Sequence, residues 1–186
     1  MSTVQKTAQT ITFKATLSEI NSWIIVRLPK EVSAQLPSRG QVMIEGTING
    51  ADLQTPLEPD GRWGHWFRVE AHVLRTIHAS VGDVLPFTIT PIKDWPEPII
   101  PADLRDALLA TPKAYDVWQK ATPMAHWEWL RWIRSTNNQE THMHRVEVAI
   151  SKLTAGERRP CCWNRNLCTE PAVSKNGMLL EGTSVR

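Results

Sequence analysis

Residues 42–57 read VMIEGTINGADLQTPL, and this stretch decides how the first half of the chain folds. Val42–Ile48 has the length and composition of a β-strand. Asn49-Gly50 follows it directly and favours a two-residue hairpin turn, because both residue types tolerate the positive φ angles that such a turn needs. Ala51–Leu57 is the expected partner strand. The stretch therefore predicts an antiparallel hairpin.

Further short strands are predicted on both sides of this hairpin. Residues 11–17 alternate between apolar and polar types, which is the period of a strand with one buried face. Trp23–Leu28, Trp63–Val69 and Val84–Ile89 are similar runs near turn residues, and Glu70–Ala79 fits either a strand or a short helix. Several short strands separated by turns favour a small β-barrel or sandwich.

The second half of the chain predicts helices. Four prolines between residues 91 and 101 form a stiff, extended connector. Thr111-Pro112 and Thr122-Pro123 each place a helix-capping threonine before a proline at the first helical position. With helices beginning near Pro101, Pro112, Pro123 and Asn137 or Asn138, this half is expected to form a small bundle. We predict an α+β protein: a small β-barrel at 11–92, a helical bundle at 99–153 and an irregular, basic, Cys-containing tail at 154–186.

Composition limits the function classes. The 186 residues include 21 Lys and Arg against 19 Asp and Glu, a net charge of +2 that is too balanced for a bulk nucleic-acid binder. The basic tail is the one segment for which binding of nucleic acid remains a hypothesis. No signal-peptide core precedes residue 11, and no run approaches the ~20 apolar residues that span a bilayer. With an odd number of cysteines, we expect a cytoplasmic protein without membrane insertion.

A spaced set of residues matches a known pattern. In the first half the set is Phe13, Ala15, Leu17, Val26, Leu28, Pro29, Val32, Arg39, Gly40, Val42, Gly46, Ile48, Asn49, Gly50, Leu57, Pro59, Gly61, Gly82, Asp83 and Val84. In the second half it is Pro101, Leu104, Ala107, Leu108, Trp132, Ile133 and the stretch 140–145. On this pattern the chain resembles the YdeI/OmpD-associated (bacteriocin-protection-like) family, in the version whose helical domain follows a small β-barrel domain of unknown function (1905 type). The resemblance implies a bacterial source and a barrel-plus-bundle architecture, and no established reaction.

The fourth predicted helix departs from that family. His142 and His144 stand where the family usually has arginines, and only Arg145 remains. If those arginines bind an anion in relatives, the resemblance implies weaker or pH-dependent binding here. The two histidines cannot chelate one metal ion from a helix, because residues two apart point in nearly opposite directions. We expect His142 to be packed or to act in capping, and His144 to be solvated.

Tryptophan and arginine supply the candidate binding residues, since nine of the residues are Trp. On the third predicted helix, Trp127 shares a stripe with Arg131 and Arg134. This stripe either packs between the domains or binds a partner or an anionic or aromatic ligand.

A second candidate group lies in the predicted strand 63–69. Trp63 and His65 fall on one strand face, which suits the barrel core or its mouth, and Trp66 and Arg68 fall on the other. Trp23 is also expected in the barrel core.

The tail contains Cys161, Cys162 and Cys168. Zinc needs four ligands, and this irregular set lacks a histidine nearby, so a ligand from elsewhere would be required. Arginines around the thiols would lower their pKa and favour thiolates. Ordinary free cysteines, redox sensing and metal binding are all consistent with this pattern.

Motifs for phosphate loops, dinucleotide binding, nucleophile elbows and zinc proteases are absent from the sequence, and no cofactor is expected. Our leading hypothesis is a non-enzymatic module that binds a small molecule or a protein where barrel and bundle meet. The alternative is a redox or metal-binding protein that acts through the tail cysteines. The oligomeric state and the partner stay open.

Overall fold

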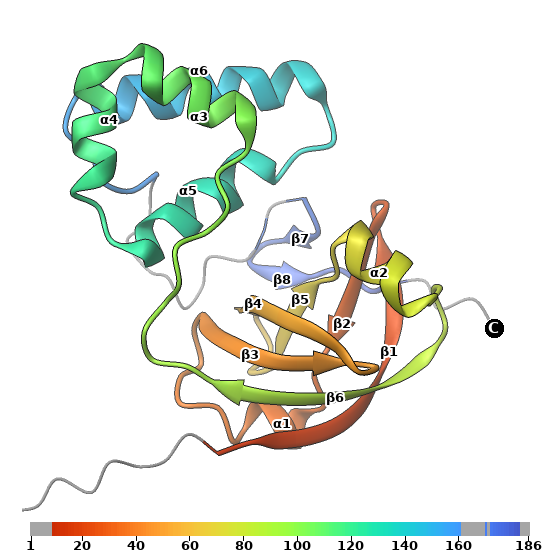
Figure 1. The fold of residues 1–186 in the computed structure, drawn as a ribbon. Coiled ribbons are helices and arrows are strands. Elements are labelled where there is room, and N and C mark those ends of the chain that lie inside the picture. Colours follow the sequence, from red (N-terminus) through yellow and green to blue (C-terminus); the bar gives the residue numbers. More distant parts are fainter. Residues whose placement is uncertain (1–8, 161–169, 171, 183–186) are drawn as a thin grey trace, which may run out of the picture. The chain divides into compact units, whose positions relative to one another are not determined.

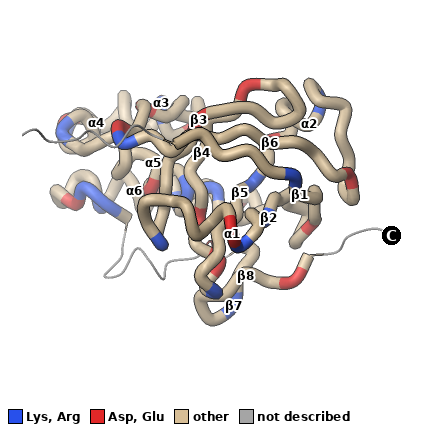
Figure 2. Tube along the Cα trace, turned by 90° about the horizontal axis from the view of Figure 1, so that it is seen from below, with Lys and Arg blue, Asp and Glu red and all other residues tan. Residues whose placement is uncertain are grey.

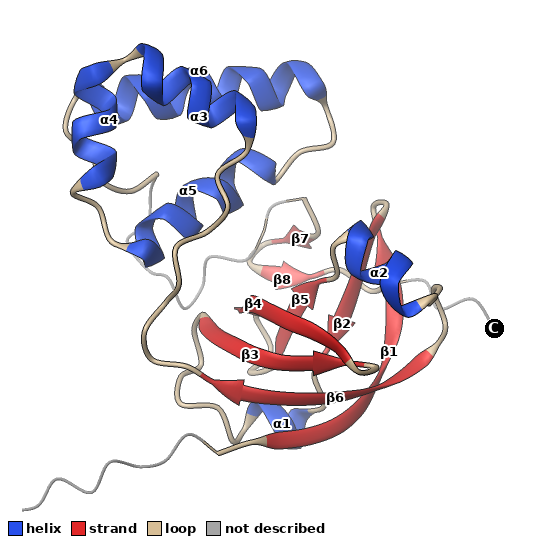
Figure 3. Cartoon of the chain, in the orientation of Figure 1, coloured by secondary structure: helices blue, strands red, loops and turns tan. Residues whose placement is uncertain are grey.

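The computed structural model describes residues 9–160, 170 and 172–182 (Figure 1). The chain divides into two compact units: residues up to Lys93 together with the C-terminal segment from Asn164, and Asp94–Trp163. Figure 3 shows that the first unit consists mainly of strands and the second of helices. The predicted α+β class is confirmed.

Six antiparallel strands form a closed barrel in the order β1-β2-β5-β4-β3-β6. Their bounds are β1 Ile11–Ile20, β2 Trp23–Arg27, β3 Val42–Ile48, β4 Ala51–Pro59, β5 His65–Arg68 and β6 Val84–Pro91. The predicted hairpin at 42–57 is present, with Asn49 and Gly50 at φ angles of 48° and 84° between β3 and β4. At Gly46 the backbones of β3 and β6 leave no room for a side chain, because a Cβ there would lie 1.9 Å from the carbonyl oxygen of Thr88 on β6.

Apolar side chains fill the barrel interior. Phe87 lies among them, stacked on Phe13 at 5.1 Å between ring centroids and edge-on to Phe67 at 6.0 Å. Two short helices, α1 (Lys30–Ser33) and α2 (Ala71–Ile77), add further apolar side chains to this core. The segment that fitted either strand or helix is therefore the helix α2.

A second small sheet lies in the C-terminal segment, which the sequence analysis predicted to be irregular. It is a hairpin of β7 (Ser174–Lys175) and β8 (Met178–Leu179). Asn176 and Gly177 make its turn at φ angles of 53° and 74°. This Asn-Gly pair is the same signal that predicted the hairpin at 42–57.

The second unit contains α3 (Ala102–Ala110), α4 (Pro112–Gln119), α5 (Pro123–Arg134) and α6 (Gln139–Thr154). Thr122 caps α5 by accepting a hydrogen bond from Ala125 N, and Asn138 caps α6 by accepting one from Thr141 N. The predicted cap at Thr111 precedes α4, but its side chain makes no capping hydrogen bond. The core of this unit consists of Leu104, Leu108, Ala114, Trp118, Trp129, Leu130, Ile133, Val146, Ala149 and Leu153.

Charged residues follow the mixed composition. Figure 2 shows Lys and Arg interspersed with Asp and Glu along the described trace of each unit. Within the described residues, none of the helices combines the length and the apolar character needed to cross a membrane.

Candidate functional site

Among the residues that the structure describes, Trp63 is the most exposed large aromatic side chain, with 79% of its surface accessible. It lies in the loop between β4 and β5, at a φ of 68° that non-glycine residues rarely adopt. The prediction that Trp63 belongs to a strand and to the barrel core is wrong. The turn after β4 occupies residues 60–64, so β5 begins only at His65.

Asp60 fixes this loop. Its Oδ1 accepts hydrogen bonds from Arg62 N at 2.7 Å and from Gly64 N at 2.8 Å, and its own N–H donates to Gly64 O at 3.0 Å. Arg39, which is exposed, donates from NH1 to Trp63 O at 3.1 Å. The indole is therefore presented by a loop that is already folded.

His65 is buried, 1% exposed, at the start of β5. Its Nε2 lies 3.0 Å from Gly40 O and donates to it, and its backbone N–H donates to Ser33 Oγ. Nδ1 then carries a lone pair, which has no hydrogen-bond partner among the described residues. Burial lowers the pKa of His65, and this outweighs the opposing effects of the Gly40 carbonyl and Asp60. The described contacts of His65 place it in the barrel wall.

Trp66 and Arg68 lie on the outer face of β5. Trp66 is 1% exposed and donates from Nε1 to Pro59 O at 3.3 Å, while the Arg68 guanidinium lies 4.1 Å above the Trp23 ring. Trp23 is buried as expected, but on this outer face and not in the barrel core, which contains Phe67 from the same strand.

The C-terminal hairpin covers that outer face. Val173 and Leu179 pack against four barrel residues in a cluster separate from the barrel core; the four are Ile20, Trp23, Ile25 and Trp66. Leu179 N donates to Asp60 O at 3.0 Å. The hairpin therefore contacts the residue that fixes the Trp63 loop.

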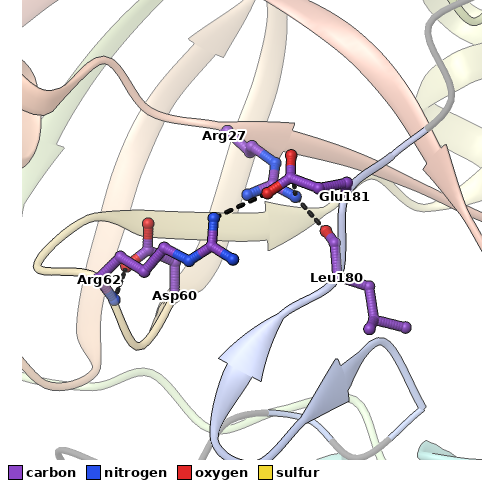
Figure 4. A network of polar contacts seen from close by, with 5 residues as sticks. All are labelled: Arg27, Asp60, Arg62, Leu180 and Glu181. Carbon is purple, nitrogen blue, oxygen red and sulfur yellow. Dashed lines mark hydrogen bonds and ion pairs between the residues drawn. The ribbon is translucent and has the colours of Figure 1, made fainter.

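Polar contacts also join the C-terminal segment to the barrel, and Figure 4 shows those made by Leu180 and Glu181. Arg62 NH1 lies 2.7 Å from Glu181 Oε1, and Arg27 NH2 lies 3.9 Å from Glu181 Oε2. Arg27 also donates to Leu180 O, and Asn21 Nδ2 donates to Ala172 O at 2.8 Å.

In the helical unit, Trp127 anchors the proline-rich segment. It is half-buried on α5 and donates from Nε1 to Pro96 O at 2.8 Å. The neighbouring His126 stacks on Trp118 at 4.1 Å, with Nδ1 2.6 Å from Glu97 Oε2. Arg131 and Arg134 are half-buried on the same helix and have interactions of their own.

His142 is half-buried, with Nε2 2.6 Å from Asp103 Oδ2 on α3. Partial burial opposes ionisation of Asp103, but the hydrogen bonds from His142 and Leu104 N outweigh it and lower the pKa of Asp103. His144 is exposed, with Nδ1 3.7 Å from a carboxylate oxygen of Glu147.

Arg145 contacts the end of α5. Its NH1 donates to Trp132 O at 2.8 Å and to Ser135 Oγ, and its guanidinium lies 5.6 Å from the centroid of the Trp132 ring. These contacts satisfy carbonyl and hydroxyl groups at a helix C-terminus, which is a structural use of the arginine.

The structure thus brings Trp63 together with Arg39 and Arg62, two residues that the sequence analysis did not select. The sequence signal that could have identified them is the turn around Asp60 and Gly61. This turn makes β5 shorter than the predicted strand 63–69. Cys161, Cys162 and Cys168 lie outside the described residues. Within the part of the chain that is described, no three His, Cys, Asp or Glu side chains gather as a metal site would require.

A six-stranded barrel followed in the chain by a four-helix unit is the architecture of a two-domain protein, and two family models match those parts. Residues 13–89 match the domain of unknown function DUF1905, and residues 97–156 match the family described as bacteriocin-protection, YdeI or OmpD-associated. The chain belongs to the YdeI/OmpD-associated family, in the form with an N-terminal DUF1905 barrel. Comparison with curated proteins gives no match.

Proposed function

We propose that the protein is a non-enzymatic binding module and that its barrel unit binds a protein partner through the Trp63 loop. The observation that carries this proposal is the 79% exposure of Trp63 on a loop fixed by Asp60. Tryptophan is among the residue types that contribute most to protein–protein binding when a partner covers them. A rigid loop also loses little conformational entropy when it binds.

The strained backbone supports the same proposal. A φ of 68° at a bulky non-glycine residue costs on the order of 1–3 kcal/mol, and such conformations concentrate at binding sites. The three contacts of the Asp60 carboxylate and backbone compensate this cost inside the loop. A loop with no need to present an indole would be more stable with glycine at position 63.

The charge around Trp63 indicates the chemistry of the partner. The exposed Arg39 contacts the carbonyl of Trp63 and supplies positive charge beside it. Arg62 precedes Trp63 with half of its side chain exposed, and its guanidinium is already paired with Glu181. A partner with an apolar pocket bordered by Asp or Glu would complement this surface. Binding should therefore weaken as salt concentration rises.

The test compares Trp63→Ala with Val84→Ala, which removes another exposed apolar side chain from the same unit. Wild-type protein is immobilised, a partner is captured from lysate and identified, and its affinity for each variant is then measured by calorimetry. We expect Trp63→Ala to weaken binding by at least about 30-fold, the loss that corresponds to a hot spot of about 2 kcal/mol, and Val84→Ala to bind as wild type. The thermal melts of both variants should match that of wild type. Equal affinity of the Trp63→Ala variant and wild type would refute the proposal.

Binding of a ligand or partner where the barrel and the helical unit meet stays a prediction. The redox or metal alternative likewise stays a prediction that falls on cysteines outside the described residues.

A further inference from the structure

We propose that the outer barrel face formed by Ile20, Trp23, Ile25 and Trp66 is a peptide-binding site, which residues 172–182 of the chain occupy in this structure. Its partner is a segment of another protein with two apolar anchors followed by a carboxylate. This site goes beyond the Trp63 loop, since Trp63 is not part of the cluster.

The face is formed without the hairpin. The six barrel strands close on one another, and none of the described residues of the C-terminal segment belongs to the apolar core inside them. The cluster around Trp23 and Trp66 is a separate one on the outside. Both family matches end before residue 157, so the barrel domain is defined without this segment.

The hairpin depends on the face. Each of its strands has two residues, and a two-stranded hairpin is marginally stable in water even when its strands are longer. Val173 and Leu179 are 0% and 1% exposed, and their burial against the two indoles supplies the apolar stabilisation that the hairpin lacks by itself. The hairpin therefore behaves as a bound ligand that is covalently attached.

The polar contacts of the face recognise main chain and charge. Asn21 and Arg27 donate from their side chains to the carbonyl oxygens of Ala172 and Leu180. Any segment with the same backbone path can accept these hydrogen bonds, whatever its side chains. Specificity then rests on the two apolar anchors and on the carboxylate of Glu181, which faces Arg27 and Arg62. Figure 4 shows how these arginines converge on the residues that follow β8.

A tethered hairpin competes with an external segment, because attachment to the same chain raises its effective concentration at the face. The experiment therefore uses full-length Leu179→Asp protein, in which the anchor is replaced by a charge that cannot be buried without cost. The matched control is Met178→Asp, which changes the neighbouring and 42% exposed side chain of the same strand. The probe is a fluorescein-labelled synthetic peptide of residues 172–182, AVSKNGMLLEG, followed by fluorescence anisotropy.

We expect the Leu179→Asp protein to bind this peptide at least tenfold more tightly than wild type or Met178→Asp protein, and to keep a cooperative barrel melt. Adding Trp23→Ala to Leu179→Asp should abolish the gain, whereas adding Trp63→Ala should leave it unchanged. Two results would overturn the inference. One is a folded Leu179→Asp protein that binds the peptide no better than wild type. The other is loss of the cooperative barrel melt on Leu179→Asp alone, which would make the hairpin an integral part of the barrel. Both results are read from peptide binding and the barrel melt, whereas the Trp63 proposal is tested separately by the affinity of its partner for Trp63→Ala protein.

Discussion

Asp103 on α3 and His142 on α6 contact each other within the helical unit, with His142 Nε2 2.6 Å from Asp103 Oδ2. Asp103 precedes Leu104, whose N–H also donates to its carboxylate. The contact joins α3 and α6, the first and last helices described in this unit.

Replacing Asp103 by Asn should lower the free energy of unfolding of the helical unit at pH 7 by less than about 1 kcal/mol, because the pair is partly exposed. The lowered pKa of Asp103 stabilises the folded state above the unfolded value of about 3.9, and this stabilisation is lost as the pH falls through the folded pKa. The difference between variant and wild type should thus shrink in acid. Urea unfolding from pH 7 to pH 3 measures it, with Asp106→Asn on the exposed side of α3 as the control. A difference that is undiminished after Asp103 has been protonated would contradict the pairing.

His65 should make the barrel sensitive to mild acid. Its pKa is lowered by burial, so the unfolded chain binds more protons than the folded one below a pH of about 6.5. The contribution of neutral His65 to the free energy of unfolding is fully present above that pH. It falls as the pH drops, with a slope of up to about 1.4 kcal/mol per pH unit, until the folded pKa is reached. His65→Gln keeps a donor for Gly40 O and removes the titration, so its stability should change less with pH. His72→Gln alters an exposed histidine and should follow wild type. Parallel curves for wild type and His65→Gln would disprove this origin of acid sensitivity.

Gly46→Ala should destabilise the barrel by about 2–4 kcal/mol, because a Cβ there would collide with Thr88 O and the φ of 155° is strained for alanine. A Cβ at position 50 would have no neighbouring atom within 4 Å. Gly50→Ala should therefore cost only the conformational energy of a φ of 84°, about 1 kcal/mol. Thermal and denaturant unfolding of the two variants separate crowding from backbone conformation. Equal losses of stability in the two variants would show that β3 and β6 can move apart to admit the Cβ at position 46.

Trp127→Phe should lower the free energy of unfolding of the helical unit by about 0.5–1.5 kcal/mol, through loss of the hydrogen bond to Pro96 O. Trp127→Ala should cost more, because apolar contact area is lost as well. Denaturant unfolding followed by circular dichroism at 222 nm measures both. A Trp127→Phe protein as stable as wild type would mean that the indole N–H does not anchor the proline-rich segment.

The barrel and the helices could be predicted because their signals are local. Alternation along β1, the Asn49-Gly50 turn and the Thr122 and Asn138 caps act within a few residues, and the structure contains each of them. The prediction for Trp63 was wrong, because apolar character was taken as burial while the Asp60 turn held the residue outside the strand. Trp23 was correctly predicted as buried, but the partner that buries it is about 150 residues away in the chain.

The candidate site could be predicted only in part for the same reason. Residue type alone was enough to select Trp63, Trp66 and Arg68. Arg39 and Arg62 could not be selected in this way, because they lie beside Trp63 only when the loop is folded. The tail hairpin carried its own Asn176-Gly177 signal, but its two-residue strands are too short for periodicity to detect. Arg145 contacts carbonyl and hydroxyl oxygens at the end of α5, and its predicted role in ligand binding stays a prediction.

The hairpin of β7 and β8 also makes the barrel unit discontinuous in the chain, with the helical unit inserted before its last segment. During synthesis on the ribosome, the six barrel strands emerge before the helical unit, and the residues that cover Trp23 and Trp66 emerge after it. Two indoles on a finished barrel therefore face the surroundings for the whole time that the helices are being translated. A nascent chain of this protein offers chaperones and partners a surface that the completed chain covers.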